Sequence, residues 1–397
     1  MAESVKSNLW KLYVTIALRW AMFAMPIIVI FYQSNGLTLR QVFILQAVFA
    51  LVAVLFEVPT GYFSDRLDRK TAIVIGLVLG FLGYATYAVS YGFISFLVAE
   101  ILLGIGGSFI SGADSALLYD SLIQLGKEGQ YKKYEGRLMS VENTAEAAAS
   151  IAGGFLAVVS LRLPIYFEAL AIFCAIPVAL TLVEPARAKL LQTGSSLKKM
   201  LEVVKFALHD QTEVKWLIFY SAIVSTATLT LVWFIQPYLT VVGVPLALFG
   251  VVWAILRFTV AAVSFSAHKI ESAWGRKKSL ISLIFLASAA YLLLSVFHNI
   301  WALSILLMFH FVHGMNDPVL KDYINKLIPS GMRATVLSVK SLIGRLLFAI
   351  LGPFIGWASD VYSLRAAFFL AGIIFLFLGL IPLLFLSKHK VLSEKST

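Results

Sequence analysis

The residues of this sequence that could do chemistry are ionisable side chains placed inside long apolar runs. A charge near the centre of a bilayer costs at least about 2.5 to 3.5 kcal/mol on insertion scales, so each one needs a partner, water or a functional role. The first half of the chain supplies Arg19, Glu100, Glu142, Glu146 and Glu168, and the second half supplies Arg257, His310, His313, Asp317, Lys340 and Arg345. We interpret them as candidates for proton transfer, solute binding or ion pairing.

Glu142 and Glu146 are four residues apart, so on a helix they share one face about one turn apart. When two carboxylates lie so near each other in a low dielectric, they tend to share one proton. The pair is therefore a candidate proton carrier, and Glu146 is favoured because it lies deeper in the apolar run. The alternative is that Glu142 lies at the interface and pairs with Arg137 or another neighbour.

Glu100 lies just before a run of small residues, Gly104 to Ser108, which predicts close helix packing on one side of its span. We interpret Glu100 as a proton-carrying or cavity residue. The alternative is a structural role as the partner of Arg19 or of another base.

His310, His313 and Asp317 lie in one apolar run, with His313 and Asp317 in i,i+4 relation. A histidine beside a carboxylate fits proton coupling, because imidazole titrates near neutral pH. The three residue types also suit a metal ion, and a polar packing cluster is the third interpretation. We predict no metal and no cofactor.

A second group of ionisable residues could line a cavity for the solute. Its members are Arg19, Glu100, Arg257, His310, Lys340 and Arg345. If they face one central cavity, the first half of the chain lines it with more acids and the second half with bases. Such a cavity suits a zwitterionic or amphipathic solute. If they instead pair across the two halves, they act as gates. The sequence leaves both interpretations open.

The composition shows which elements must position these residues. Of 397 residues, 60% are hydrophobic and 13% charged, against about 25% charged in globular domains. Apolar runs of roughly 20 to 28 residues are each long enough to cross a bilayer as a helix, whereas barrels show short alternating segments. We predict an all-α integral membrane protein. Twelve transmembrane helices are expected at 11–33, 39–63, 70–91, 93–119, 135–159, 163–183, 214–240, 245–272, 277–297, 299–326, 331–358 and 363–386.

The basic residues in the loops predict the orientation. One side of the membrane receives only Arg40, Arg162 and Arg365, so the positive-inside rule places both termini in the cytoplasm. The first run is interpreted as a retained span and not as a signal peptide. The net charge of +11 is spread over many short loops, so it reflects topology and predicts no nucleic-acid partner.

The longest polar connection, from Glu184 to Glu213, divides the chain into two halves. Its apolar positions 197, 200, 201, 204 and 208 follow helical spacing, which predicts an amphipathic helix on the inner leaflet. We expect an N-terminal six-helix bundle (1–184), a cytoplasmic linker (185–213) and a C-terminal six-helix bundle (214–397). The halves carry a weak repeat, because Gly275–Lys278 matches the tail of an earlier charged turn and Gly314–Asp322 matches Gly112–Asp120.

That earlier turn, Glu57 to Lys70, places five charges in the six residues from Asp65 to Lys70. Its pattern of Gly61, three residues, Asp65, Arg66, one residue, Arg69 and Lys70 resembles the signature loop between the second and third helices of major facilitator superfamily (MFS) transporters. The likeness is to the bacterial-type twelve-helix members of the drug and solute exporter branch.

The resemblance implies two pseudo-symmetric six-helix bundles that rock around a central site to give alternating access. In that family, the residues matching Asp65, Arg66 and Arg69 make cytoplasmic contacts between helices. Together with Gly61 and Lys70, they would form a conformational latch and would not bind the solute.

No phosphate-binding glycine loop, His-Glu-x-x-His run or nucleophile elbow occurs in the sequence, so we predict no enzyme activity. The single Cys174 excludes an internal disulfide and a cysteine-based metal site. The first hypothesis is a proton-coupled secondary transporter of a small organic solute, an antiporter that works in efflux. Its partners would be the solute, protons and the lipid bilayer, and we expect a monomer in the bacterial inner (plasma) membrane. The alternatives are a lipid or lysolipid flippase, which needs a site opening sideways between helices, and a non-transporting receptor or scaffold.

Overall fold

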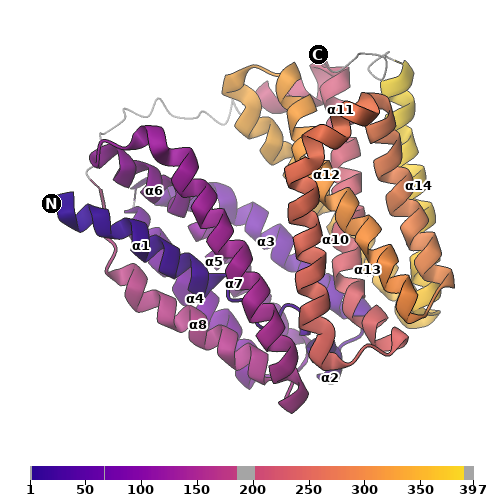
Figure 1. The fold of residues 1–397 in the computed structure, drawn as a ribbon, viewed down its shortest axis with the longest axis horizontal. Coiled ribbons are helices and arrows are strands. Elements are labelled where there is room, and N and C mark those ends of the chain that lie inside the picture. Colours follow the sequence, from indigo (N-terminus) through magenta and orange to yellow (C-terminus); the bar gives the residue numbers. More distant parts are fainter. Residues whose placement is uncertain (1, 67, 186–201, 389–397) are drawn as a thin grey trace. The chain divides into compact units, whose positions relative to one another are not determined.

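Helices make up the ordered framework of the chain (Figure 1). The computed structural model describes residues 2–66, 68–185 and 202–388, without the side chains of 2–4, 58, 61–66, 330 and 334. These residues contain no strand, so the predicted all-α class is confirmed for the part of the chain that is described.

The helices of the first half of the chain are α1 (Ala2–Arg19), α2 (Ile28–Ser34), α3 (Leu39–Arg66), α4 (Arg69–Val89), α5 (Gly92–Ile110), α6 (Ala113–Gln124), η1 (Glu128–Gln130), α7 (Tyr131–Val159) and α8 (Leu163–Leu180). Those of the second half are η2 (Phe206–Asp210), α10 (Thr212–Val242), η3 (Leu246–Leu248), α11 (Phe249–Val296), η4 (Ile300–Ala302), α12 (Leu303–Leu327), η5 (Ser330–Met332), α13 (Arg333–Val361) and α14 (Leu364–Lys388). The predicted amphipathic helix is described only from residue 202 onwards, where 202–205 are helical and Phe206–Asp210 form a π-helix.

The chain forms two compact units that do not divide it at a single point. Unit 1 comprises Met1–Thr38, Val48–Leu191 and Pro245–Ala254, and unit 2 comprises Leu39–Ala47, Gln192–Val244 and Ile255–Thr397. Helix α3 therefore begins in unit 2 and continues in unit 1, while α11 begins in unit 1 and continues in unit 2. The expected division at the linker 185–213 therefore does not account for α3 and α11, each of which has residues in both units.

In each unit, one helix packs closely against several others. In unit 1, α4 packs against α5 and α8, while in unit 2, α10 packs against α12, α13 and α14. Both cores are apolar, as shown by Leu77 and Leu117 in unit 1, which are 1% and 0% exposed. Tyr291 in unit 2 is fully buried and stacks on Phe375, with 5.7 Å between the ring centroids.

Eight segments of the described residues are long and apolar enough to cross a membrane. Three expected spans, 11–33, 135–159 and 299–326, are not among them. The first is interrupted, and the other two carry several of the ionisable residues considered above. The expected spans 245–272 and 277–297 fall mostly within α11, where Gly275 has a non-helical backbone (φ 72°, ψ 164°), and the start of the first lies in η3. The count of twelve spans remains a prediction.

The expectation of one continuous helix at 11–33 is wrong, because the chain leaves the helix between α1 and α2. Pro26 lies in this break, and proline cannot donate the helical hydrogen bond. Ser150 Oγ donates to the Met22 carbonyl at 3.3 Å, and the Ala24 N–H donates to a Glu168 carboxylate oxygen at 2.7 Å. Neighbouring helices thus satisfy the freed backbone groups, as a span interrupted in a membrane requires.

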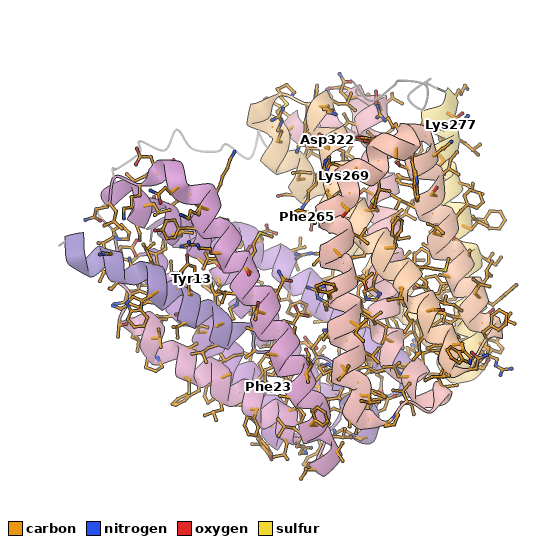
Figure 2. The ribbon with its side chains drawn as sticks, viewed as in Figure 1. Tyr13, Phe23, Phe265, Lys269, Lys277 and Asp322 are labelled. Atoms are coloured by element: carbon orange, nitrogen blue, oxygen red, sulfur yellow. The ribbon has the colours of Figure 1, made fainter. Side chains whose placement is uncertain are left out.

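Close backbone packing holds this break in place. A Cβ on Gly153 of α7 would lie 1.9 Å from the carbonyl oxygen of Phe23, which lies in the break and is labelled in Figure 2. Only glycine allows that approach. The expected span 93–119 is also divided, into α5 and α6, at Gly112, whose φ of 78° favours glycine.

Candidate functional site

Arg19 brings together acidic side chains from two other helices of unit 1. Its guanidinium lies 3.6 Å from the Asp114 carboxylate of α6, with the two side chains 25% and 18% exposed. Glu142 of α7 lies within electrostatic range of Arg19. Arg19 and Glu142, predicted for separate roles, thus belong to one cluster. Asp114 was not predicted, and its only signal was its place in the repeated segment that starts at Gly112.

Glu146 is directed to a different partner from that of Glu142. Its carboxylate is 4% exposed and accepts a hydrogen bond of 3.1 Å from the indole Nε1 of Trp253. Trp253 lies on the first residues of α11, which approach α7 closely, since a Cβ on Gly250 would lie 1.9 Å from the Ser150 carbonyl oxygen. The two carboxylates share a helix but contact different elements.

Glu100 is part of a buried cluster with tyrosines. The Tyr32 hydroxyl donates to Glu100 Oε1 at 3.0 Å and lies 3.0 Å from the Tyr87 hydroxyl. Glu100 and both tyrosines are at most 3% exposed. Arg19 forms its ion pair with Asp114, so the proposed Arg19–Glu100 pair is not what the structure shows. Glu168, also buried, binds the backbone of the α1–α2 break.

In unit 2, the carboxylate of Asp317 is paired with lysine. Lys340 Nζ of α13 lies 2.9 Å from Asp317 Oδ1, and Lys321 Nζ lies 3.4 Å from Oδ2. His313, the i,i+4 neighbour of Asp317, instead places Nδ1 3.4 Å from the Thr228 hydroxyl. The structure therefore joins Asp317 to Lys340, a contact between two predicted residues that the sequence had not linked.

The remaining basic candidates of unit 2 lie on α11, α12 and α13. His310 is 7% exposed and places Nδ1 2.8 Å from the Leu306 carbonyl oxygen. Arg257 lies within electrostatic range of both His310 and His313. Arg345 is partly exposed on α13 and forms no ion pair with any residue that the structure describes.

The charged turn holds the start of α4 through two acids. Arg69 Nη1 lies 2.8 Å from Asp120 of α6. The backbone N–H groups of Arg69 and Lys70 donate to the two carboxylate oxygens of Glu184, at 3.1 and 3.0 Å. An anion there stabilises the helix N-terminus. The side chains of Asp65 and Arg66 lie outside the described part of the structure.

Unit 2 carries a comparable contact at the repeated turn. Arg276 Nη2 lies 2.6 Å from Glu213, and its guanidinium carbon lies 4.8 Å from the Tyr323 ring centroid. The Tyr323 hydroxyl donates to Glu271 at 2.5 Å. An arginine at the same place in each half thus binds acidic or aromatic groups of its own unit.

The sequence that forms these helices and turns matches a known family. A model of the Major Facilitator Superfamily matches residues 9–353 and 274–397. The chain belongs to the Major Facilitator Superfamily. It is therefore a multi-pass integral membrane protein of a transporter family, and the predicted family is confirmed.

Two relatives within the superfamily show the level of similarity. Over 207 residues, the chain is 25% identical to the quinolone resistance protein NorA of Staphylococcus aureus, covering 52% of this chain and 50% of NorA. The match thus spans half of that relative's length. Over 365 residues, the chain is 21% identical to the MFS-type transporter YxaM of Bacillus subtilis, covering 88% of each chain.

Two solved MFS structures share the fold. The nucleoside transporter NupG has a TM-score of 0.80 at 13% identity, covering 96% of this chain and 98% of NupG. A bacterial homologue of the human lysosomal transporter Spinster has a TM-score of 0.75 at 18% identity, covering 99% of both chains. At these identities the likeness shows the fold alone.

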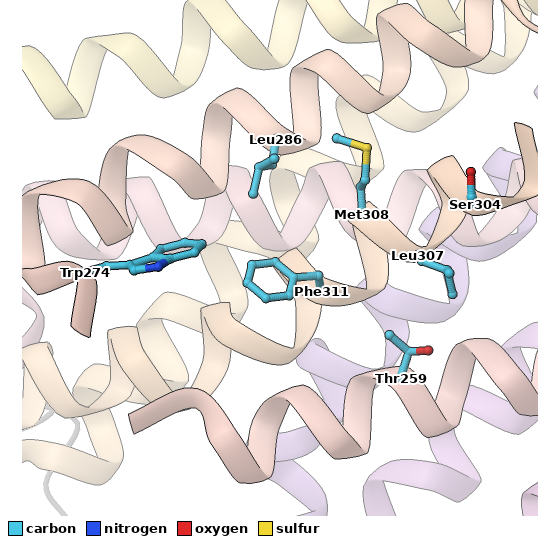
Figure 3. Close-up of a pocket in the computed structure, with 7 residues that line it drawn as sticks. All are labelled: Thr259, Trp274, Leu286, Ser304, Leu307, Met308 and Phe311. Carbon is cyan, nitrogen blue, oxygen red and sulfur yellow. The ribbon is translucent and has the colours of Figure 1, made fainter. Parts of the chain in front are cut away.

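Unit 2 of this MFS protein also contains an apolar pocket of about 390 Å³ (Figure 3). It lies among the two arms of α11 and the helix α12, and its lining includes no predicted site residue. The lining residues are Thr259, Trp274, Leu286, Ser304, Leu307, Met308 and Phe311. Only two of them carry hydroxyls and none is charged, so the pocket offers no ion pair to a solute.

Proposed function

We propose that this MFS protein is a secondary active transporter that exports a small organic solute in exchange for protons by alternating access. The observation that carries the proposal is the hydrogen bond between Glu146 and Trp253. Glu146 is a buried group that can bind a proton, and Trp253 lies on α11, a helix that begins in unit 1 and continues in unit 2. A proton that binds or leaves Glu146 therefore alters a contact on a helix that both units share.

The cluster around Arg19 supports proton exchange for a second reason. Asp114 lies 3.6 Å from Arg19, so the guanidinium is paired whether or not Glu142 carries a proton. When Glu142 is ionised, the single guanidinium lies near two carboxylates and the cluster has an excess negative charge. A proton on Glu142 removes that excess, which would be costly to keep away from water. Glu100, His313 and Asp317 remain further candidates for proton transfer.

The charge distribution favours a zwitterionic or amphipathic solute. Unit 1 carries the candidate carboxylates together with Arg19, and unit 2 carries Arg257, His310, Lys340 and Arg345. Arg345, which has no ion-pair partner among the described residues, is a candidate for contact with an anionic group of the solute. The similarity to NorA, a quinolone resistance protein, supports export of an organic compound.

The charged turn would act as the conformational latch that the family resemblance implies. Arg69 already links α4 to α6 through Asp120 at 2.8 Å. Asp65 and Arg66, with Gly61 and Lys70, would complete this latch on the cytoplasmic side. The proposal includes both termini in the cytoplasm, a bacterial inner membrane and a monomer divided at 185–213.

A ligand screen comes first. Because a ligand that prefers the native state raises its stability, we would measure thermal unfolding of detergent-purified protein against solutes and lipids at about pH 5.5 and 7.5. A soluble ligand with a pH-dependent effect would define the solute class. Stabilisation by lipids or lysolipids alone would favour the flippase instead.

Flux in liposomes then tests the coupling. With a pH-sensitive dye inside the vesicles, we expect solute-dependent proton movement in the wild type. Glu146→Gln should strongly reduce it, because the amide oxygen can still accept from Trp253 but the side chain can no longer bind and release a proton. Glu128→Gln, at an exposed carboxylate of η1, is the matched control and should behave as the wild type. Solute flux that ignores the pH gradient would exclude proton coupling.

A further inference from the structure

The start of α3 is held by an acid 321 positions along the chain. Asp360, on the last turn of α13, accepts hydrogen bonds from the Leu39 N–H to Oδ1 at 2.9 Å and from the Arg40 N–H to Oδ2 at 2.7 Å. The first N–H groups of a helix have no partner within it. One carboxylate thus satisfies two of them and places a negative charge at the positive end of the helix dipole.

Two glycines of α13 let the same turn of α3 approach closely. A Cβ would lie 2.9 Å from the Phe43 ring at Gly352 and 2.7 Å from it at Gly356, and the latter would also lie 3.1 Å from the Arg40 Cα. Phe43 is fully buried, and its centroid is 4.9 Å from that of Phe234. The fit therefore needs glycine at both positions of α13.

Because α3 has residues in both units, its contact with α13 bears on any movement between the units. Residues 39–47 belong to unit 2, and the helix continues in unit 1 from Val48. If the units move relative to each other, a stiff helix cannot follow both. Either the contact with α13 opens or α3 bends near residue 47.

We propose that Asp360, with Gly352 and Gly356, forms a clamp on the first turn of α3 that is closed in one state of the transport cycle and released in another. Asp360 is then a positioning residue for the conformational change. This inference rests on the proposed transport function. It adds a site of control that is separate from the charged turn and from the proton-carrying candidates.

The clamp itself is tested by hydrogen exchange of the backbone in detergent or nanodiscs. Asp360→Ala should accelerate exchange in the segment 36–47 about tenfold, because two charge-assisted hydrogen bonds are lost. Asp360→Glu, which keeps a carboxylate, should recover part of the protection. Ser359→Ala, on the same turn of α13, is the control and should exchange like the wild type.

A second pair of variants tests the glycine face independently of charge. Gly356→Ala introduces a Cβ that must push α3 away, and it should also accelerate exchange in 36–47. Gly344→Ala lies on the same helix, but its Cβ would meet only Ala222 at 3.8 to 3.9 Å, an ordinary contact. Both changes raise helix propensity similarly, so only the clash distinguishes them.

Transport decides whether the clamp controls the cycle. Asp360→Ala and Gly356→Ala should each change the turnover number at least about threefold, with the two control variants unchanged, because a lost contact shifts the populations of the two states. Unchanged exchange in 36–47 would overturn the clamp. Faster exchange with wild-type turnover would show that the clamp exists but does not control transport, which also overturns the inference. Absence of flux in the wild type would refute the proposed function, while the exchange data would still report on the clamp.

Discussion

Lys340 on α13 and Asp317 on α12 form an ion pair of 2.9 Å that is buried at one end only. The Lys340 side chain is 8% exposed, whereas the Asp317 side chain is 53% exposed. Lys321, one helical turn from Asp317, lies 3.4 Å from its second carboxylate oxygen. The carboxylate therefore has a second cation and solvent, while the ammonium of Lys340 depends on Asp317.

This asymmetry predicts unequal effects of removing either partner. Asp317→Asn leaves the buried ammonium without its counter-charge and should cost on the order of 2 kcal/mol, whereas Lys340→Met leaves a carboxylate that still has Lys321 and should cost about 1 kcal/mol or less. We expect the double variant to unfold close to Lys340→Met. Thermal unfolding of the three purified variants is the measurement. Equal losses from the two single changes would contradict the prediction.

Trp253 should matter for turnover through its hydrogen bond and not through its bulk. Trp253→Phe keeps a ring but removes the donor to Glu146, and the loss of one buried hydrogen bond to a carboxyl group corresponds to about a tenfold effect. We expect turnover in liposomes to fall by that factor with little change in KM. Trp301→Phe, at a residue that is 82% exposed, is the control. A similar loss in both variants would point to a general effect of tryptophan removal.

Gly250 should tolerate no side chain, because its Cβ would lie 1.9 Å from the backbone oxygen of Ser150. Backbone cannot rotate away, so Gly250→Ala should displace the start of α11 and destabilise the fold by about 1 to 3 kcal/mol. Gly107→Ala, on helix α5 with nothing within 4 Å of its Cβ, should be neutral or slightly stabilising. The melting temperatures of the two purified variants check this, and a neutral Gly250→Ala would refute the close approach of α11 and α7.

The latch predicts a kinetic effect without a binding effect. Asp65→Asn should slow transport several-fold while the solute affinity stays close to wild type, since a residue that stabilises a conformational state does not contact the solute. Asp120→Asn, which releases Arg69 from its 2.8 Å ion pair, should act in the same direction. Initial flux rates and ligand-binding isotherms measure the two quantities separately. Reduced affinity with normal turnover would exclude the latch.

Much of the fold could be predicted, because the information is local. Hydrophobicity over about 20 residues predicts a membrane helix, and the charged turn from Gly61 to Lys70 was specific enough to indicate the family. The interruption between α1 and α2 was missed for the opposite reason. Its freed groups are satisfied by Ser150 and Glu168, far along the chain, and hydropathy does not report such partners.

For the candidate site too, the local sequence did not indicate partners that are distant along the chain. Spacing placed Glu142 and Glu146 on one face and paired His313 with Asp317, but the structure gives each carboxylate a partner from another element. Glu146 binds Trp253, 107 positions away. A helical repeat describes neighbours on one helix, whereas the choice of partner depends on which surfaces the packing brings together.

The sequence alone determined the helical class, the membrane environment and the family. Each depends on the length of an apolar run or on a compact charged motif, and these are properties of short stretches of chain. The tertiary structure decided which charges meet, where the first span breaks and that α3 and α11 are shared between two units. The contact of Asp360 with Leu39 and Arg40 illustrates why. Nothing near Leu39 in the sequence indicates its cap, since the fold supplies the carboxylate from the far end of the chain.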